Sequence, residues 1–326
     1  MRGHHLVFLE RNVEWYARNR DLTAPDFCRL ELYNDLSDLF HRFETDIKYA
    51  DLVIVGSYVP EGVAVSNWVT GKSGGITAFY DIDTPVTLNK LANKDFEYIS
   101  PDQIQKFHLY LSFTGGALLE RLKADFGAQL IKPLYCSADP DIYYPVNMKT
   151  EWDLGYMGTY SAERQDAVER FFLIPARKCR FRRFAIAGAQ FPDHIDWPDN
   201  VLRIPHLPCA EHRSFYNQQR FTLNLTRDPM VKAGYSPSVR IFEAAACGST
   251  ILSDAWAGIE TFFQPGSEII ILRNSLEVCD MLNSMSDRDR KAIGQAARAR
   301  YLREHTPAKR ACELEVYFKE ALSGAA

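Results

Sequence analysis

The sequence predicts an α/β protein built from two doubly wound domains. Short apolar strand patterns alternate with amphipathic helix patterns through both halves of the chain, which is typical of parallel α/β layers. Residues 133–150, proline-rich and without periodicity, interrupt this alternation and predict an interdomain hinge. A length of 326 residues and an apolar content of 46% suit two domains with separate cores.

The first half contains six strand patterns, with helix patterns between most of them. We expect strands at 5–10, 29–33, 51–56, 76–81, 109–113 and 129–135. The clearest helices are expected at 36–49 and 116–126, where apolar residues recur at helical spacing. The first domain is therefore placed at residues 1–140.

The second half restarts the same alternation. Strands are expected at 152–157, 184–188, 201–204, 221–225, 250–253 and 269–272. Two helices, 287–304 and 307–322, close the chain. The second domain is placed at 141–306, and residues 307–326 are expected to return as a helix toward the first domain. Ligands of such sheets bind beyond the carboxyl ends of the strands.

Composition restricts the partners of the protein. A net charge of −4 argues against a nucleic-acid or anionic-membrane surface, and the basic run 177–183 is interpreted as a solvated helix end. The seven cysteines are odd in number and never spaced as CxxC, which is typical of free thiols in a reducing compartment and suggests no zinc site. No apolar run is long enough for a membrane span, so a cytoplasmic protein is predicted.

The segment 236–248 predicts a helix that could hold an anion. Ser236 and Pro237 form a helix start, Gly248 a helix end, and Ser236, Arg240 and Glu243 share one face. Free amides at the start and Arg240 one turn later suit a diphosphate. Glu243 lies about 10 Å further along the axis, within reach of an attached ribose. The alternative is an ordinary Arg240–Glu243 pair on a surface helix.

A family resemblance adds to this interpretation. Residues 236–254, with the run EAAACG before a strand, resemble the donor-binding segment of the group 1 nucleotide-sugar glycosyltransferases. Segments such as DLVIVGSYVPEGVAV, FYDIDTPVTL and WDLGYMGTYSAERQ resemble the CgeB-like (spore maturation) branch, over nearly the whole chain. The resemblance implies the GT-B fold, with two Rossmann-like domains facing across a cleft. It also implies sugar transfer from a nucleotide-activated donor to an unknown acceptor. Because the helix start and Arg240 can stabilise the leaving diphosphate, this transfer is expected to be metal-independent.

By this resemblance, Glu243 would hold the donor ribose, while Arg240 and the amides of Ser238 and Val239 would face the diphosphate. Two departures stand out. Tyr235 occupies a position where many group 1 enzymes carry a glutamate at the donor sugar. The chain also starts at what resembles the second strand of the branch. Its first domain would then lack the first strand, a glycine-rich loop and a helix, through a mis-assigned start or a trimmed protein.

These departures motivate an alternative function, a non-catalytic sugar-nucleotide or glycan-binding protein derived from the same fold. They also leave the strand at 5–10 as an apolar sheet edge, through which two copies could associate as a homo-oligomer.

Further candidates flank the strand ends. Asp81 and Asp83 follow a strand, and they could face the cleft, cap local structure or hold a metal. No metal, no cofactor besides the donor and no catalytic residue is assigned.

Other candidates lie elsewhere along the chain. Arg227 and Lys232 are expected either near phosphate or in a solvated loop, and Arg164 could be a surface residue. Trp256 could line the binding site of the nucleotide base or belong to the core. Two glycine-containing turns are expected to approach the ligand: Thr114 and Gly115, and Gly158, Thr159 and Tyr160.

Overall fold

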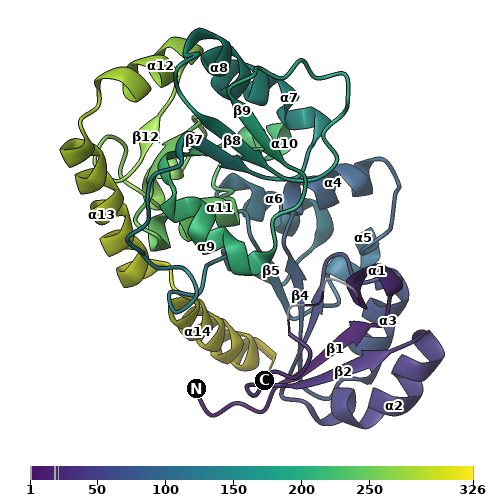
Figure 1. The fold of residues 1–326 in the computed structure, drawn as a ribbon. Coiled ribbons are helices and arrows are strands. Elements are labelled where there is room, and N and C mark those ends of the chain that lie inside the picture. The colour runs from purple at the N-terminus through teal and green to yellow at the C-terminus, as the bar shows by residue number, and fades with distance from the viewer. Residues whose placement is uncertain (1, 18–19, 21, 326) are drawn as a thin grey trace. The chain divides into compact units, whose positions relative to one another are not determined.

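A computed structural model describes residues 2–17, 20 and 22–325 of the chain. The chain divides into two compact units (Figure 1). Unit 1 comprises Met1–Ser112, Leu119–Lys132 and Val316–Ala326, and unit 2 comprises Phe113–Leu118 and Pro133–Glu315. In the described part of the chain, no helix has both the length and the apolar character needed to cross a membrane.

Unit 1 contains two parallel sheets, one with the order β1-β2 and one with the order β3-β4-β5-β6. Their strands are β1 Val7–Arg11, β2 Arg29–Tyr33, β3 Leu52–Gly56, β4 Ile76–Asp81, β5 Leu109–Ser112 and β6 Leu130–Pro133. The central strand β4 is buried almost throughout, and Phe79 packs against Phe107 and Tyr110. Strand β1 is different, because Val7 and Phe8 are exposed.

The helices of unit 1 follow the amphipathic pattern of the sequence. In α2, Asp35 caps the first turn by accepting from the Asp38 amide, and one face buries Leu39, Phe43 and Ile47 at helical spacing. The helices are α1 Glu14–Ala17, α2 Leu36–Tyr49, α3 Gly62–Lys72, α4 Thr84–Ala92, α5 Pro101–Ile104 and α6 Ala117–Phe126. Helix α14, Pro307–Ala325, contributes its residues from Val316 onward to this unit.

Unit 2 has one parallel sheet with the order β12-β11-β10-β7-β8-β9. Its strands are β7 Trp152–Met157, β8 Phe184–Ala187, β9 Val201–Ile204, β10 Gln219–Asn224, β11 Thr250–Ser253 and β12 Ile270–Ile271. From β7 the chain proceeds outward to β9, and from β10 it proceeds outward in the opposite direction to β12. The order therefore reverses between β7 and β10, which makes this position the topological switch point.

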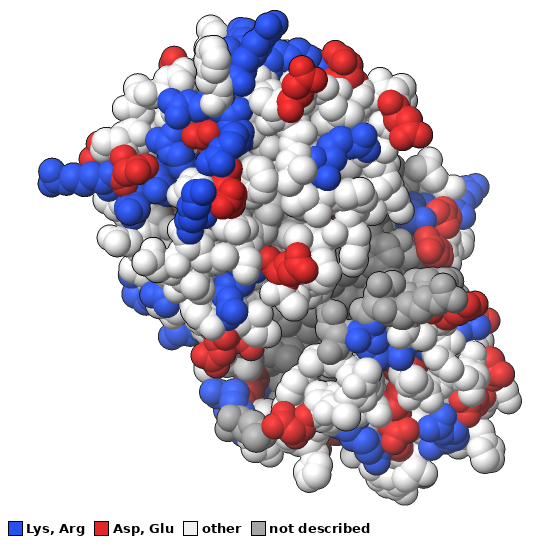
Figure 2. Space-filling model, viewed as in Figure 1, with Lys and Arg blue, Asp and Glu red and all other residues white. Residues whose placement is uncertain are grey.

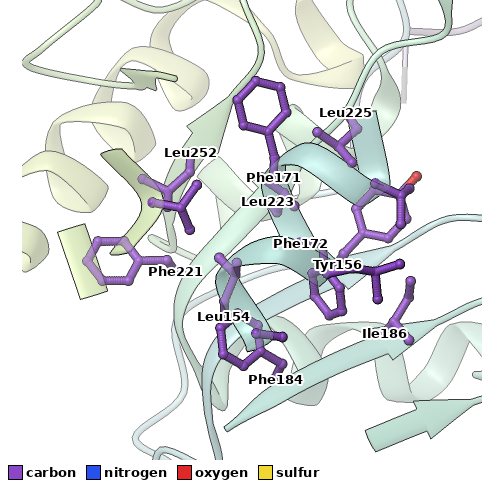
Figure 3. Packing of buried hydrophobic residues seen from close by; sticks show 14 of the residues in the cluster. Leu154, Tyr156, Phe171, Phe172, Phe184, Ile186, Phe221, Leu223, Leu225 and Leu252 are labelled. Atoms are coloured by element: carbon purple, nitrogen blue, oxygen red, sulfur yellow. The ribbon is translucent and has the colours of Figure 1, made fainter. Parts of the chain in front are cut away.

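Helices cover both faces of this sheet. They are α7 Gln165–Val168, α8 Ile174–Lys178, α9 Cys209–Asn217, α10 Asp228–Ala233, α11 Val239–Ala246, α12 Ser275–Ser284 and α13 Asp287–Glu304. A π-helical turn at Glu169–Leu173 joins α7 to α8 and buries Phe171 and Phe172. Figure 3 shows these two rings among strand residues that include Leu154, Phe184 and Leu223. This core thus holds in place the strands whose carboxyl ends carry the candidate nucleotide-binding residues.

The predicted α/β class is confirmed. Within the residues that the structure describes, each of the twelve predicted strands is present, with ends that agree within two residues. The helices expected at 36–49 and 287–304 have these bounds in the structure. These agreements follow from the local periodicity of apolar residues, which the sequence displays directly.

Candidate nucleotide-binding site

Arg240 spans the switch point of the unit 2 sheet. Its Nε donates to the carbonyl oxygen of Met157 at the end of β7, and its Nη1 donates to Oδ1 of Asn224 at the end of β10, at 2.8 Å. The guanidinium also lies over the ring of Tyr156, 4.8 Å from its centroid. Since Arg240 is only 6% exposed, these contacts hold a positive charge where sheets of this kind bind ligands.

Helix α11 begins at Val239, so the predicted start at Ser236 and Pro237 is wrong. Ser238 is the N-cap residue, and its Oγ donates to Oδ1 of Asn224 at 2.7 Å. Ser236 instead shares a hydrogen bond of 2.9 Å with Oγ1 of Thr114. Ser236 therefore leaves the face formed by Arg240 and Glu243, and Glu243 lies only about 6 Å along the axis from the helix start.

Three guanidiniums gather beside this helix start. Arg164 donates from Nη2 to the carbonyl oxygen of Thr159 at 2.8 Å, and Arg227 donates from Nε to Glu163 at 2.8 Å. Burial lowers the pKa of Arg164, and the positive charges of Arg240 and Arg227 lower it further. Among the described residues, the buried Nε of Arg164 has no hydrogen-bond partner. Excess positive charge of this kind favours an anionic ligand.

Two glycines allow this close packing. A Cβ atom on Gly158 would lie 2.7 Å from Nη2 of Arg240 and 2.8 Å from the hydroxyl of Tyr156. Gly188, directly after β8, has φ +154°, and a Cβ there would overlap the carbonyl oxygen of Gly158. The ends of β7 and β8 therefore pack against each other through backbone atoms, with no side chain between them. Gly158 is among the residues that the sequence predicts for the site, and Gly188 is not.

Thr159 and Tyr160 follow Gly158 along the chain. Thr159 is exposed, and its carbonyl oxygen accepts from Arg164. Tyr160 is half-buried with its ring 5.6 Å from that of Phe191. Tyr160 thus packs against the loop after β8.

Glu243 lies one helical turn beyond Arg240 and is 8% exposed. Its Oε2 accepts from the hydroxyl of Tyr216 at 2.6 Å, whereas the hydroxyl of Tyr143 shares a hydrogen bond of 3.3 Å with Nδ1 of His212. Burial and the adjacent charge of Glu243 raise the pKa of both phenols, so both stay protonated. Tyr216 therefore orients the carboxylate, and no spacing in the sequence signals it.

Tyr235 joins three loops of unit 2. Its amide donates to the carbonyl oxygen of Ala257 at 2.6 Å, and its carbonyl oxygen accepts from Gly115 at 2.9 Å. The Tyr235 ring occupies the space that a Cβ would need on Gly116 or Gly258. The backbone of Tyr235 is left-handed, with φ +47°. The structure therefore places Thr114 and Gly115 beside the start of α11. Because Gly116 has no side chain, the Tyr235 ring can pack directly against its backbone.

The two aspartates after β4 belong to unit 1 and have different surroundings. Asp81 is fully buried and accepts from Tyr110 at 2.6 Å, Thr87 at 3.0 Å and the amide of Asp83 at 3.1 Å. Burial raises the pKa of Asp81. Asp83, partly exposed at the N-cap of α4, accepts from Tyr58 at 2.6 Å. Within the described ranges, no three His, Cys, Asp or Glu side chains form a potential metal site.

The remaining candidates have simpler environments. Lys232 is exposed and pairs with Asp228 at 2.6 Å, one turn away on α10. Trp256 is buried, and its ring centroid lies 5.8 Å from that of Phe262. The interpretation of Trp256 as a core residue is therefore confirmed.

Residues 164–315 match the model of a family described as glycosyl transferase-like. No curated protein matches the sequence.

Among solved structures, sucrose-phosphate synthase of Thermosynechococcus elongatus is similar, with a TM-score of 0.66 and 13% identity, over 99% of this chain and 90% of that one. HepE of Anabaena, solved in complex with UDP-glucose, has a TM-score of 0.69 and 11% identity, over 98% of this chain and 100% of that one. The chain therefore has the two Rossmann-like domains of the GT-B fold, and its residues 164–315 match the glycosyl transferase-like family.

Proposed function

We propose that the protein is a glycosyltransferase that moves a sugar from a nucleotide-activated donor to an unidentified acceptor. The observation that carries the proposal is the group of Arg164, Arg227 and Arg240 at the switch point, beside the amino end of α11. These guanidiniums and the first amides of α11 suit a diphosphate. The UDP-glucose complex of HepE supports a sugar nucleotide as the ligand class.

In this proposal, the site stabilises the leaving group. The bond between the anomeric carbon and the diphosphate oxygen breaks while an acceptor oxygen bonds to that carbon and gives up its proton. Negative charge then gathers on the departing nucleoside diphosphate. Arg240, already held by Met157 and Asn224, would stabilise this charge without reorganising. Glu243, oriented by Tyr216, would accept hydrogen bonds from the donor ribose.

Replacement of Glu243 tests this arrangement. We expect Glu243→Ala to weaken nucleoside diphosphate binding by about 1–3 kcal/mol, the scale of lost hydrogen bonds to a charged group. Titration calorimetry with UDP, GDP and ADP would measure the loss and identify the preferred base. Glu243→Gln is the matched control, because it keeps an acceptor for Tyr216 and should retain the fold. Unchanged affinity of both variants for every nucleotide would remove Glu243 from the site.

Metal independence is a second expectation. Because arginines and helix amides can neutralise the leaving diphosphate, release of nucleoside diphosphate from a sugar nucleotide should continue in EDTA. Water serves as the acceptor in this assay, so the natural acceptor need not be known. Loss of turnover in EDTA with recovery in manganese would instead favour a metal role for Asp81 and Asp83.

Tyr235 favours a second candidate, a non-catalytic sugar-nucleotide or glycan-binding protein. Its ring occupies the space between Gly116 and Gly258, at the position where the resembled family carries a glutamate. Nucleotide binding without turnover of any sugar nucleotide would support this candidate.

We further propose that the protein acts in the cytoplasm as a member of the CgeB-like branch. Two copies would associate through the exposed edge of β1, where Val7 and Phe8 offer apolar contacts.

A further inference from the structure

A turn between α8 and β8 presents a phenylalanine to solvent. The Arg182 amide donates to the carbonyl oxygen of Cys179 at 2.9 Å, which closes a turn with Phe181 at its tip. Phe181 is 102% exposed, as accessible as in an extended chain. The base of the turn is anchored, because Cys179 is buried in the unit 2 core. The exposed ring is therefore carried by a hydrogen-bonded turn whose first residue is packed in the core.

Cations flank this ring. Lys178 and Arg180 are exposed, and within the described part of the chain neither forms an ion pair. Arg183 is also exposed, with Glu151 at 3.8 Å, whereas Arg182 is held by Asp153 at 3.3 Å. Figure 2 shows Lys and Arg side chains gathered, with a few Asp and Glu side chains among them, over the region where Figure 1 places α8, α12 and β7. The tip therefore combines one aromatic ring with unneutralised positive charge.

We propose that residues 178–183, the basic turn, dock the protein peripherally on an anionic phospholipid bilayer. An aromatic ring suits the boundary between headgroups and acyl chains, and lysine and arginine suit anionic headgroups. The net charge of −4 opposes long-range attraction, but screening confines each charge to about 8 Å, so the basic turn acts locally.

A nucleic acid fits these observations less well. It would need an extended basic track, and Glu151 and Asp153 interrupt the positive charge beside the basic turn. The basic turn precedes β8 and so lies at the amino end of that strand. Arg240 lies at the carboxyl ends of β7 and β10. Within unit 2, docking through the basic turn leaves the candidate nucleotide site open.

Vesicle sedimentation with the full chain tests the proposal. Vesicles of equal parts phosphatidylcholine and phosphatidylglycerol should bind the protein, and phosphatidylcholine vesicles should bind it weakly. Phe181→Ala should lower the partition coefficient roughly tenfold or more, because it removes the inserted ring. Lys178→Gln and Arg180→Gln should each lower it about fivefold, and added salt should reduce the binding of the wild type.

Matched controls separate the basic turn from general surface effects. Phe96→Ala removes another exposed ring and Lys123→Gln another exposed cation, both in unit 1, and neither should change vesicle binding. The proposal is overturned if the wild type does not bind anionic vesicles, or if Phe181→Ala binds them with the same partition coefficient as the wild type. Tighter binding to heparin or single-stranded DNA than to vesicles, unaffected by Phe181→Ala, would also overturn it in favour of a polyanion site.

Discussion

Gly188→Ala is expected to lower the free energy of unfolding by about 3–5 kcal/mol, because the cost of overpacking and the cost of a strained φ, each about 1–3 kcal/mol, add at this position. The added Cβ would overlap the carbonyl oxygen of Gly158, which is backbone and cannot rotate away. The φ of +154° at this position is also a conformation that side chains rarely adopt. Urea denaturation followed by tryptophan fluorescence would measure the loss.

The same substitution should also weaken nucleotide binding, since Gly158 borders the Arg240 guanidinium. Gly56→Ala is the matched control, because Gly56 also lies at the end of a parallel strand, yet its Cβ would meet no atom within 4 Å. The close approach of β7 and β8 would be refuted if Gly188→Ala were as stable as Gly56→Ala and bound nucleotide normally.

Acidification from pH 7 to pH 4 should destabilise the protein through His305 by roughly 3 kcal/mol. Burial, and repulsion from Arg310, lower the pKa of His305 from 6.5 to about 4. Its Nε2 contacts the carbonyl oxygen of Phe262 at 3.1 Å, and its Nδ1 contacts Nη2 of Arg310 at 3.0 Å. Since Arg310 can only donate, the neutral ring must accept at Nδ1.

Below pH 6.5 the unfolded state binds a proton at His305 that the folded state does not bind until about pH 4. Stability therefore falls as the pH falls through this window, and it is fully present above it. His305→Gln keeps a donor for Phe262 and should flatten the pH dependence measured by urea denaturation. His194→Gln, at an exposed position, should leave it unchanged. Equal slopes for wild type and His305→Gln would show that His305 does not titrate in this window.

The sequence alone determined the elements of the fold, because their signals are local. Strand β4 is a short, mostly apolar segment, and helix α2 repeats apolar residues at helical spacing beside a capping aspartate. Arg240 and Glu243 could likewise be placed on one helix, since only their own spacing was needed.

The tertiary structure decided how those residues are held. Within its own segment, Ser236 has the features of a helix cap. In the structure its hydroxyl hydrogen-bonds to Thr114, which is distant in the sequence, and the N-cap position of α11 falls at Ser238. Tyr216 on helix α9 orients Glu243 on helix α11. Arg164 becomes a candidate for anion binding only because the fold places it near Arg227 and Arg240. Periodicity reports which face of an element is buried. Burial, charge and hydrogen bonding at a site depend on which distant segments the fold brings into contact.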